Sequence, residues 1–280
     1  TPAGQIAITH TSFNIITTLL LLPLGNYLAK AAVKILPDRP EDKDERMHLE
    51  YLTPIQTGSK ESGLGVAAIQ VDQLQHELHR MMLMAQENVE ASFRSVLDRN
   101  EDELSQVEET EEYIDFLNRE ISLHISHVIA YETNQQASAV VSSFLTISGN
   151  IERIGDYGKK LLEYYAYRQN RPKDFSQQAM TELSGMYAEA HHAIVTALDG
   201  FINDDPDKAR EVAPIAGKLR GLEVELRNRH IQRLDKQECD SETGLVYVDL
   251  LGIIEHIGYH SNNVAKATIS SCTAEHKAKA

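Results

Sequence analysis

The phrase NIERIGDYGKKLLE, residues 150–163, has a counterpart about a hundred residues later in IIEHIGYHSNNVAK, residues 253–266. Both phrases carry Glu, Ile and Gly at the same spacing, in stretches whose apolar residues recur every three or four positions, as in a helix. The second phrase has Tyr259 where the first has Asp156. The chain therefore repeats a helical unit and keeps the full acidic pair in the first copy.

The likeness between the two halves extends beyond these phrases. Shifting the chain by 105 residues places the apolar positions of two preceding segments on one another. The matched pairs are Met81 with Met186, Ala85 with Ala190, Val89 with Ile194, Phe93 with Leu198, Val107 with Val212, Ile114 with Leu219, and Ile121 with Leu226. The phrases themselves match at a shift of 103, which aligns Glu152 with Glu255. We therefore predict an all-α fold of two tandem three-helix bundles that arose by duplication.

Helix boundaries follow from the apolar periodicity and from the stretches that interrupt it. The first helix begins after residue 63, ends at DRNEDE (98–103), and is expected to bury a stripe of Ile69, Leu74, Leu78, Met81, Ala85, Val89, Phe93 and Val96. The later helices are expected at about 102–130, 132–168, 175–202, 206–236 and 243–274. Asp205 before Pro206 is typical of a helix start. The predicted bundles occupy residues 63–168 and 169–280.

Composition limits the classes of function. The chain has 280 residues with 42 acidic and 27 basic side chains, a net charge of −15 and no strong basic patch, so no nucleic-acid binding is expected. Its two cysteines, Cys239 and Cys272, form no paired metal-binding motif and fit a reducing compartment. The sequence has neither a phosphate-binding glycine loop nor a serine-nucleophile motif. We therefore predict that the protein is not an enzyme.

Residues 1–36 differ from the rest of the chain. They contain no Asp or Glu, and the window 6–28 has roughly the 20 residues that a membrane-spanning helix needs. Lys30, Lys34 and Arg39 follow it, and by the positive-inside rule they place the later residues in the cytoplasm. We therefore predict one transmembrane helix in residues 1–36. The alternative is an amphipathic or core helix of a soluble protein.

The stretch 37–62 combines three prolines with a dense mixture of charges. This composition predicts a linker with room for one short ordered piece. Because the first residue is Thr, we expect the chain to be a fragment or a processed product. The segment before it is then expected to carry the main activity.

Glu152 and Asp156 are candidate ligands in the first copy. Residues four apart on a helix share a face, with Cβ atoms about 5–6 Å apart, so two carboxylates there repel unless a cation or water lies between them. Carboxylate oxygens are ligands for hard and first-row cations. The alternative is a solvated face on which Arg153 forms ordinary ion pairs. A glycine inside a helix costs about 1 kcal/mol relative to alanine. We therefore expect neighbouring helices to approach closely at Gly155 and Gly258, where the missing side chain makes room for them.

The stretch ERIGDYGKKLLE (152–163) resembles the signature of PhoU domains, which contains a Glu-x-x-x-Asp pair. RNEDELSQVEETEEYIDFLNREI (99–121) is similar to the second helix of the same module. The likeness covers about residues 63–274, and tandem three-helix bundles are the architecture of the family. It implies a protein that regulates phosphate uptake, with Glu152 and Asp156 as ligands of a divalent or iron-type metal.

The second copy departs from the family pattern. The resemblance carries Glu255 over as a ligand, but Tyr259 replaces the second acid and is a poor ligand for most divalent metals. His256 and His260 are nearby nitrogen donors. We take His260 as the residue that would complete a second metal site.

AITHTSFNIITTLLLLPL (7–24) resembles the last membrane segment of bacterial type II sodium/phosphate cotransporters. The residues that carry this likeness are His10, Thr11, Phe13, Asn14 and Pro23. Some of those transporters end in a cytoplasmic PhoU-like domain. The order of membrane segment, charged linker and double bundle matches that layout.

Together the two resemblances imply the C-terminal portion of a sodium-dependent inorganic phosphate transporter in the plasma (inner) membrane, with residues 37–280 cytoplasmic and regulatory. Phosphate and the coupling ion, sodium, would then bind upstream membrane helices. The alternative is a stand-alone PhoU-like adaptor that regulates a separate phosphate transporter or sensor kinase. A homodimer is left open. A soluble metal-storage bundle would need more carboxylates converging in its core than the sequence shows.

Overall fold

The chain divides into two compact units, Thr1–Met47 and His48–Ala280. The computed structural model describes scattered positions between 5 and 18 and then residues 47–52, 64–98, 104–131, 135–169 and 175–279. Almost all of the described residues belong to the second unit, which contains the helical repeat.

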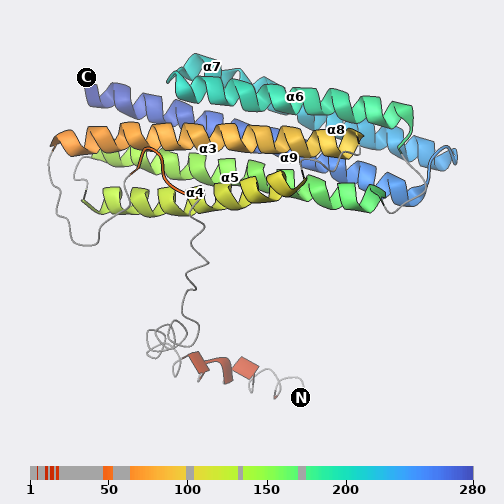
Figure 1. The fold of residues 1–280 in the computed structure, drawn as a ribbon, viewed down its shortest axis with the longest axis horizontal. Coiled ribbons are helices and arrows are strands. Elements are labelled where there is room, and N and C mark those ends of the chain that lie inside the picture. The colour runs from red at the N-terminus through yellow and green to blue at the C-terminus, as the bar shows by residue number, and fades with distance from the viewer. Residues whose placement is uncertain are drawn as a thin grey trace. The chain divides into compact units, whose positions relative to one another are not determined.

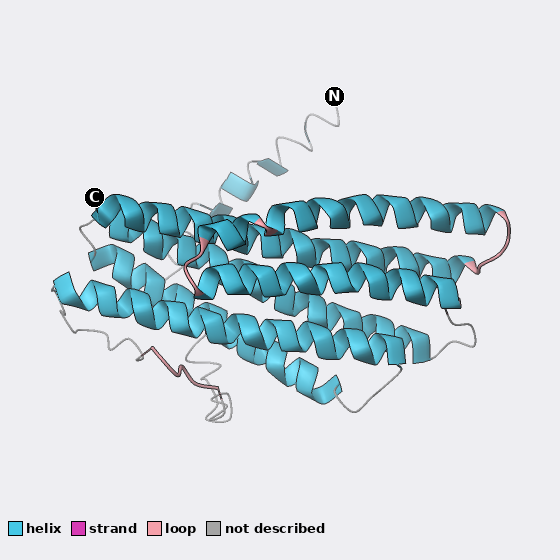
Figure 2. Ribbon diagram, turned by 90° about the horizontal axis from the view of Figure 1, so that it is seen from above, coloured by secondary structure: helices cyan, strands magenta, loops and turns pink. Residues whose placement is uncertain are grey.

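The second unit is built from long helices that lie roughly along one direction, together with one helix of five residues (Figure 1). They are α3 (Leu64–Asp98), α4 (Leu104–Tyr131), α5 (Gln135–Gln169), α6 (Gln177–Ile202), α7 (Pro206–Arg210), α8 (Val212–Asp235) and α9 (Ser241–Lys279). Within the described ranges every element is a helix or a loop, and no strand is present (Figure 2). The predicted all-α class is confirmed.

Polar side chains cap the starts of two helices of the second copy, α6 and α7. The Ser176 hydroxyl accepts a backbone N–H of the first turn of α6 and caps that helix. Asp205 caps α7 in the same way, and Pro206 stands in its first turn, where a missing N–H costs little. The predicted helix 206–236 is interrupted at Glu211, so α7 and α8 are separate elements.

The third helices of the two copies, α5 and α9, pack against each other in opposite directions. Near the middle of α5, the Asn150 Oδ1 accepts a hydrogen bond from His260 Nδ1 at 2.9 Å. Further along α5, the Tyr164 hydroxyl lies 3.3 Å from the Oδ2 of Asp249, which precedes His260 on α9. A later residue of α5 thus meets an earlier residue of α9, as in an antiparallel pair.

The first helices of the two copies, α3 and α6, form a second antiparallel pair. The Phe93 ring stacks on Tyr187 with the ring centroids 3.8 Å apart. The Gln75 side chain, earlier on α3, donates to the carbonyl of Phe201, later on α6. Equivalent helices therefore pair with each other, which is the arrangement of two copies related by a two-fold rotation.

The matched apolar positions of the repeat form the core. Those with at most 1% of their surface exposed include Met81, Met186, Ala85, Ala190, Val89, Ile194, Ile114 and Leu219. Gly155 and Gly258 lie at close crossings, as predicted. A Cβ at Gly155 would lie 3.1 Å from the Cδ1 of Ile114, and one at Gly258 would overlap the Cδ1 of Leu219.

The prediction that Ile69 belongs to the buried stripe of α3 is wrong, since this side chain is 60% exposed. A helix turns by about 100° per residue, so the five-residue step from Ile69 to Leu74 leaves Ile69 roughly 140° away from Leu74. Leu74 and the later residues of the stripe are buried. The stripe therefore begins at Leu74.

The first unit is described at few positions. They are helical, and Asn14 Nδ2 lies 3.3 Å from His10 Nδ1, one turn away. Most of the predicted membrane helix in residues 1–36 lies outside the described residues, as does most of the predicted linker 37–62. Among the described helices, none combines the length and the apolar character needed to cross a bilayer. The transmembrane prediction thus has no support from the part of the chain that the structure describes.

Candidate metal-binding site

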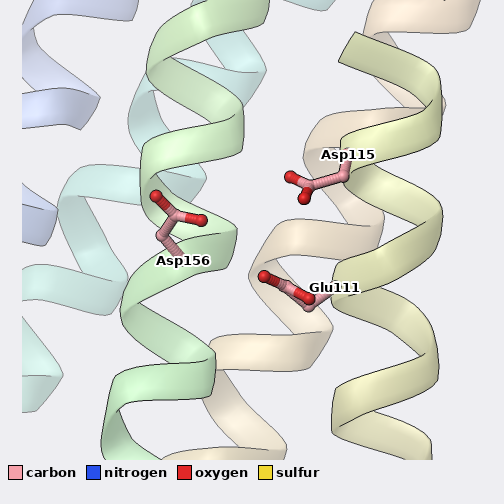
Figure 3. A group of neighbouring side chains, drawn as sticks. All are labelled: Glu111, Asp115 and Asp156. Atoms are coloured by element: carbon pink, nitrogen blue, oxygen red, sulfur yellow. The ribbon is translucent and has the colours of Figure 1, made fainter. Parts of the chain in front are cut away.

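Three carboxylates on two neighbouring helices form the candidate site. Glu111 and Asp115 project from α4 and Asp156 projects from α5 (Figure 3). Each contributes one oxygen to a group whose members all lie within 4.8 Å of one another. We call these three residues the carboxylate cluster.

A close crossing of α4 and α5 brings the cluster together. Gly155 precedes Asp156, and Ile114 precedes Asp115. Because Gly155 has no Cβ, the fully buried Ile114 side chain can pack directly on the backbone of α5. The four-residue spacing then places Glu111 on the same face of α4 as Asp115. The glycine therefore sets the separation at which the acids of the two helices meet.

The acids disfavour one another's charged forms. Although the Asp115 side chain is exposed on its outer side, the loss of part of its hydration beside the helices raises its pKa first, and the negative charges of Glu111 and Asp156 raise it further. The pKa of Glu152 is also raised, first by burial and then by Asp156. A raised carboxyl pKa means that folding loses stability as the pH rises through the carboxyl range. A bound cation would offset this repulsion.

Two basic side chains partly balance the acids. The Lys159 Nζ lies 2.7 Å from Glu111 Oε2. Arg153 lies between two acids, with its Nη1 3.3 Å from Asp156 Oδ2 and its Nε 3.6 Å from Glu152 Oε2. These ion pairs of Arg153 are the ones expected under the alternative hypothesis, in which the acidic face of α5 is simply solvated. Of the two acids predicted from the sequence, Asp156 belongs to the carboxylate cluster and Glu152 borders it.

Sequence reasoning missed Glu111 and Asp115 as site residues. A signal for them was present, because EEYID (111–115) has the same Glu-x-x-x-Asp spacing as the acids of α5. Spacing alone shows that each pair shares a helix face. It does not show that two such faces meet, which depends on how α4 and α5 cross.

The second copy replaces the acids of the cluster. At the shift of 105, Ala216 stands at the position of Glu111 and Arg220 at that of Asp115. The Arg220 Nε lies 3.7 Å from Glu255 Oε1, so Glu255 faces a positive side chain of its own copy. The charge that an external cation would supply in the first copy is supplied here by a guanidinium.

His260 makes its contacts at the interface of α5 and α9. Its Nδ1 donates to Asn150, and its ring lies against Tyr157 with the centroids 5.8 Å apart. Burial lowers the pKa of His260 to about 4, and the neighbouring His256 contributes to the shift. Among the described side chains, neither His260 nor Glu255 joins a group of three metal-ligating residues. Metal binding in the second copy stays a prediction.

The donor set of the carboxylate cluster suits a hard or first-row divalent cation. All its donors are carboxylate oxygens, which such cations accept readily. Glu111 is buried, Asp156 is half-buried and Asp115 is exposed, so the cluster is open to solvent on the Asp115 side. A cation could therefore enter from solution and keep water as a further ligand.

The family model of the PhoU domain matches the chain twice, over residues 78–165 and over residues 183–268. Together the matches cover more than half of the chain. The first falls on α3, α4 and α5, and the second on α6 to α9.

Several curated proteins are similar in sequence. A phosphate-specific transport system accessory protein PhoU homolog of Thermotoga maritima is 24% identical over 70% of this chain and 84% of its own length. A PhoU homolog of the same description from Clostridium acetobutylicum is 23% identical over 73% of this chain and 93% of its length. A Salmonella typhimurium protein named for inorganic phosphate export, YjbB, is 20% identical over 89% of this chain. The chain covers 44% of the length of YjbB.

Two solved structures share the fold. PhoU from Pseudomonas aeruginosa matches with a TM-score of 0.59 at 17% identity, over 73% of this chain and 97% of that one. The phosphate transport system regulatory protein PhoU from Streptococcus pneumoniae matches with a TM-score of 0.65 at 14% identity, over 73% and 96%. The arrangement of α3 to α9 is therefore that of known PhoU structures.

Proposed function

The chain belongs to the PhoU domain family, and we propose that it regulates phosphate transport as an accessory protein whose first helical copy binds a divalent metal cation. The double match to the PhoU domain, once in each copy of the repeat, is the observation that carries the regulatory role. The carboxylate cluster supports the cation. The proposal assigns the chain no catalytic step.

A separate phosphate transporter at the cytoplasmic face of the membrane is the proposed partner. Two of the relatives are accessory proteins, and the chain covers 84% and 93% of their lengths. This favours the adaptor alternative over the C-terminal part of a sodium/phosphate cotransporter. Neither sodium nor a homodimer is needed for the adaptor role.

A second candidate is a regulatory domain of a phosphate export protein. The observation that favours it is the match to YjbB, which extends over 250 residues and 89% of this chain, beyond the reach of the two PhoU matches. In that case the helical copies would act on a membrane domain of the same polypeptide. In both candidate functions, the bound cation would belong to the part of the protein that regulates phosphate transport.

Metal content measured by mass spectrometry tests the cation site. The full chain is purified without a histidine tag, loaded in turn with Mn²⁺, Fe²⁺ and Zn²⁺, and desalted. Wild type is expected to retain metal, and the double variant Asp115→Asn/Asp156→Asn is expected to lose it. Asp115→Asn removes a repelled charge, but Asp156→Asn also removes the ion pair with Arg153. Circular dichroism and urea denaturation without metal therefore show whether the double variant is folded.

Glu225→Gln is the matched control for this measurement. Glu225 is an exposed acid of α8 that pairs with Arg229, away from the carboxylate cluster, so its loss should leave metal retention unchanged. Metal retained equally by wild type and by the double variant contradicts the assignment of the site. The same holds for wild type that retains none of the three metals.

Uptake of radiolabelled phosphate tests the regulatory role. Cells that lack the chain are complemented with wild type or with Asp115→Asn/Asp156→Asn, and uptake is followed in phosphate-rich and phosphate-poor medium. Wild type is expected to change how uptake depends on external phosphate, and the double variant to behave as the empty vector. Uptake that is identical with and without the wild-type chain rules out the role in phosphate transport.

A further inference from the structure

A short non-helical segment, His48–Leu52, lies against α3 and α4 (Figure 1). We call it the strap. Its last residue, Leu52, is 3% exposed and belongs to the hydrophobic core of the helices. The Tyr51 ring lies beside His76 of α3, with the ring centroids 5.3 Å apart. The strap is therefore packed on the helices at its apolar end.

A fully buried carboxylate on α3 holds the backbone of the strap. The Glu77 Oε2 accepts three consecutive backbone N–H groups, those of Glu50 at 2.9 Å, Tyr51 at 2.8 Å and Leu52 at 3.3 Å. The Glu77 side chain has no exposed surface. A buried charge is tolerated only when its hydrogen bonds and its counter-charge are in place. Without the strap, this oxygen would lose all three of these donors.

Arg80 and Tyr113 complete the docking site at the other end of the strap. Arg80 supplies the counter-charge, since its Nε donates to Glu77 Oε1 at 2.8 Å. Its Nη2 donates to the carbonyl of His48 at 2.8 Å, and the Tyr113 hydroxyl donates to the same carbonyl at 2.9 Å. The Arg80 guanidinium also lies over the Tyr113 ring, 5.1 Å from its centroid. Tyr113 thus links α4 to the strap.

The second copy shows how an equivalent carboxylate is satisfied without a strap. The shift of 105 aligns Glu77 with Glu182, whose side chain is also nearly buried. Glu182 accepts hydrogen bonds from Arg233 at 3.0 and 2.9 Å and from Tyr247 at 2.6 Å. The positions of the first copy that match these two donors hold residues without a polar side chain, Val128 and Phe144. In the first copy, the hydrogen bonds to the buried carboxylate therefore come from the strap and from Arg80.

Tyr113 also stands next to the carboxylate cluster on α4. It lies two residues after Glu111 and two before Asp115, and at about 100° per residue it projects from roughly the opposite side of the helix. The cluster acids face α5, whereas Tyr113 faces Arg80 on α3. A shift of α4 that draws the acids toward Asp156 therefore moves Tyr113 away from the strap.

We propose that Glu77, Arg80 and Tyr113 form a docking site for the strap, and that a cation at the carboxylate cluster loosens the strap through α4. The second part rests on the proposed cation site. The docking of residues 48–52 on α3 and α4 would then depend on whether the carboxylate cluster holds a cation.

Hydrogen exchange followed by mass spectrometry tests both parts on the full chain, with Mn²⁺ as the probe. In wild type, saturating Mn²⁺ should speed the exchange of the amides of residues 50–52 at least threefold. In Tyr113→Phe, which leaves the cluster intact, Mn²⁺ should bind without this change. In Asp115→Asn, Mn²⁺ should have no effect on these amides.

The docking site is tested without metal by Glu77→Gln. The amides of residues 50–52 should then exchange at least tenfold faster than in wild type. Glu182→Gln is the matched control, because it alters the equivalent buried carboxylate of the second copy and should leave the strap unchanged. Circular dichroism and exchange in the core of α5 show whether each variant is folded.

The outcomes separate this inference from the proposed function. Strap amides that remain slow in folded Glu77→Gln overturn the docking site. Mn²⁺ that binds wild type, measured by calorimetry, but leaves the strap amides unchanged overturns the coupling while the cation site stands. A wild-type chain that binds no Mn²⁺ overturns the coupling and counts against the cation site, and Glu77→Gln still decides the docking site.

Discussion

Replacing Gly258 with Ala should destabilise the protein relative to the same change at Gly252, six residues earlier on α9. Both glycines lie in the interior of this helix, where Ala is favoured over Gly by about 0.8–1 kcal/mol. A Cβ at Gly252 would have no neighbouring atom within 4 Å. Gly252→Ala should therefore raise the free energy of unfolding by about 1 kcal/mol.

At Gly258 the added methyl group has no room. It would lie closer than 3.0 Å to the Cδ1 of Leu219, and Leu219 has no exposed surface into which it could move. Overpacking of this kind costs about 1–3 kcal/mol. Gly258→Ala should therefore be about 1–3 kcal/mol less stable than Gly252→Ala, which cancels or reverses the gain in helix propensity. At Gly155, where the nearest Ile114 atom lies 3.1 Å away, the effect should be intermediate.

Urea denaturation measures this series, because variants with the same slope can be compared through their midpoints. Leu219→Val provides a second check, since it should cost less in the Gly258→Ala background than in wild type, with a coupling of about 0.5–3 kcal/mol. If Gly258→Ala and Gly252→Ala stabilise the protein equally, the close crossing of α8 and α9 is not present. Additive effects of Gly258→Ala and Leu219→Val would lead to the same conclusion.

Two further predictions concern charged groups at the interfaces. Glu182→Gln should lower stability by about 1.5–3 kcal/mol, because Glu182 accepts charged hydrogen bonds in a nearly buried position. Burial opposes its charge, but the bonds from Arg233 and Tyr247 outweigh burial and lower its pKa. This contribution to stability should therefore be present above the ordinary carboxyl pKa and be lost as the pH falls through the pKa of Glu182 in the folded protein. The urea midpoints at pH 7 and pH 3 should then differ less in Glu182→Gln than in wild type. The pKa of His260 in the folded protein is lowered to about 4. As the pH falls from 6.5 to 4, His260 becomes protonated in the unfolded chain but stays largely neutral in the folded protein. The free energy of unfolding of wild type should therefore fall by about 1–2 kcal/mol over this range, a value that allows for partial exposure of the ring. His260→Gln should flatten that dependence in urea midpoints, and an unchanged slope would contradict the burial of the ring.

Helix positions were accessible from the sequence because burial in a helical bundle repeats every three to four residues. This pattern places Leu74 and the residues after it correctly. It fails at Ile69, because a step of five residues along a helix turns Ile69 away from the face that carries Leu74. The capping residues Ser176 and Asp205 act locally, so the start of a helix can be predicted from its neighbours in the chain. The interruption at Glu211 also has a local cause, because Pro214 has no N–H and its ring would clash with the carbonyl of Arg210, four residues earlier, in an unbroken helix.

By itself, the sequence determined that the chain is all-helical, that a unit of three helical segments is repeated, and that the acidic pair is complete only in the first copy. These properties depend on the order and period of residues along one chain. Only the tertiary structure decided that Asp156 meets Glu111 and Asp115, while Glu255 meets Arg220. The physical reason is that charge repulsion and cation binding depend on distances between helices, which are set by the packing of buried side chains at their crossings.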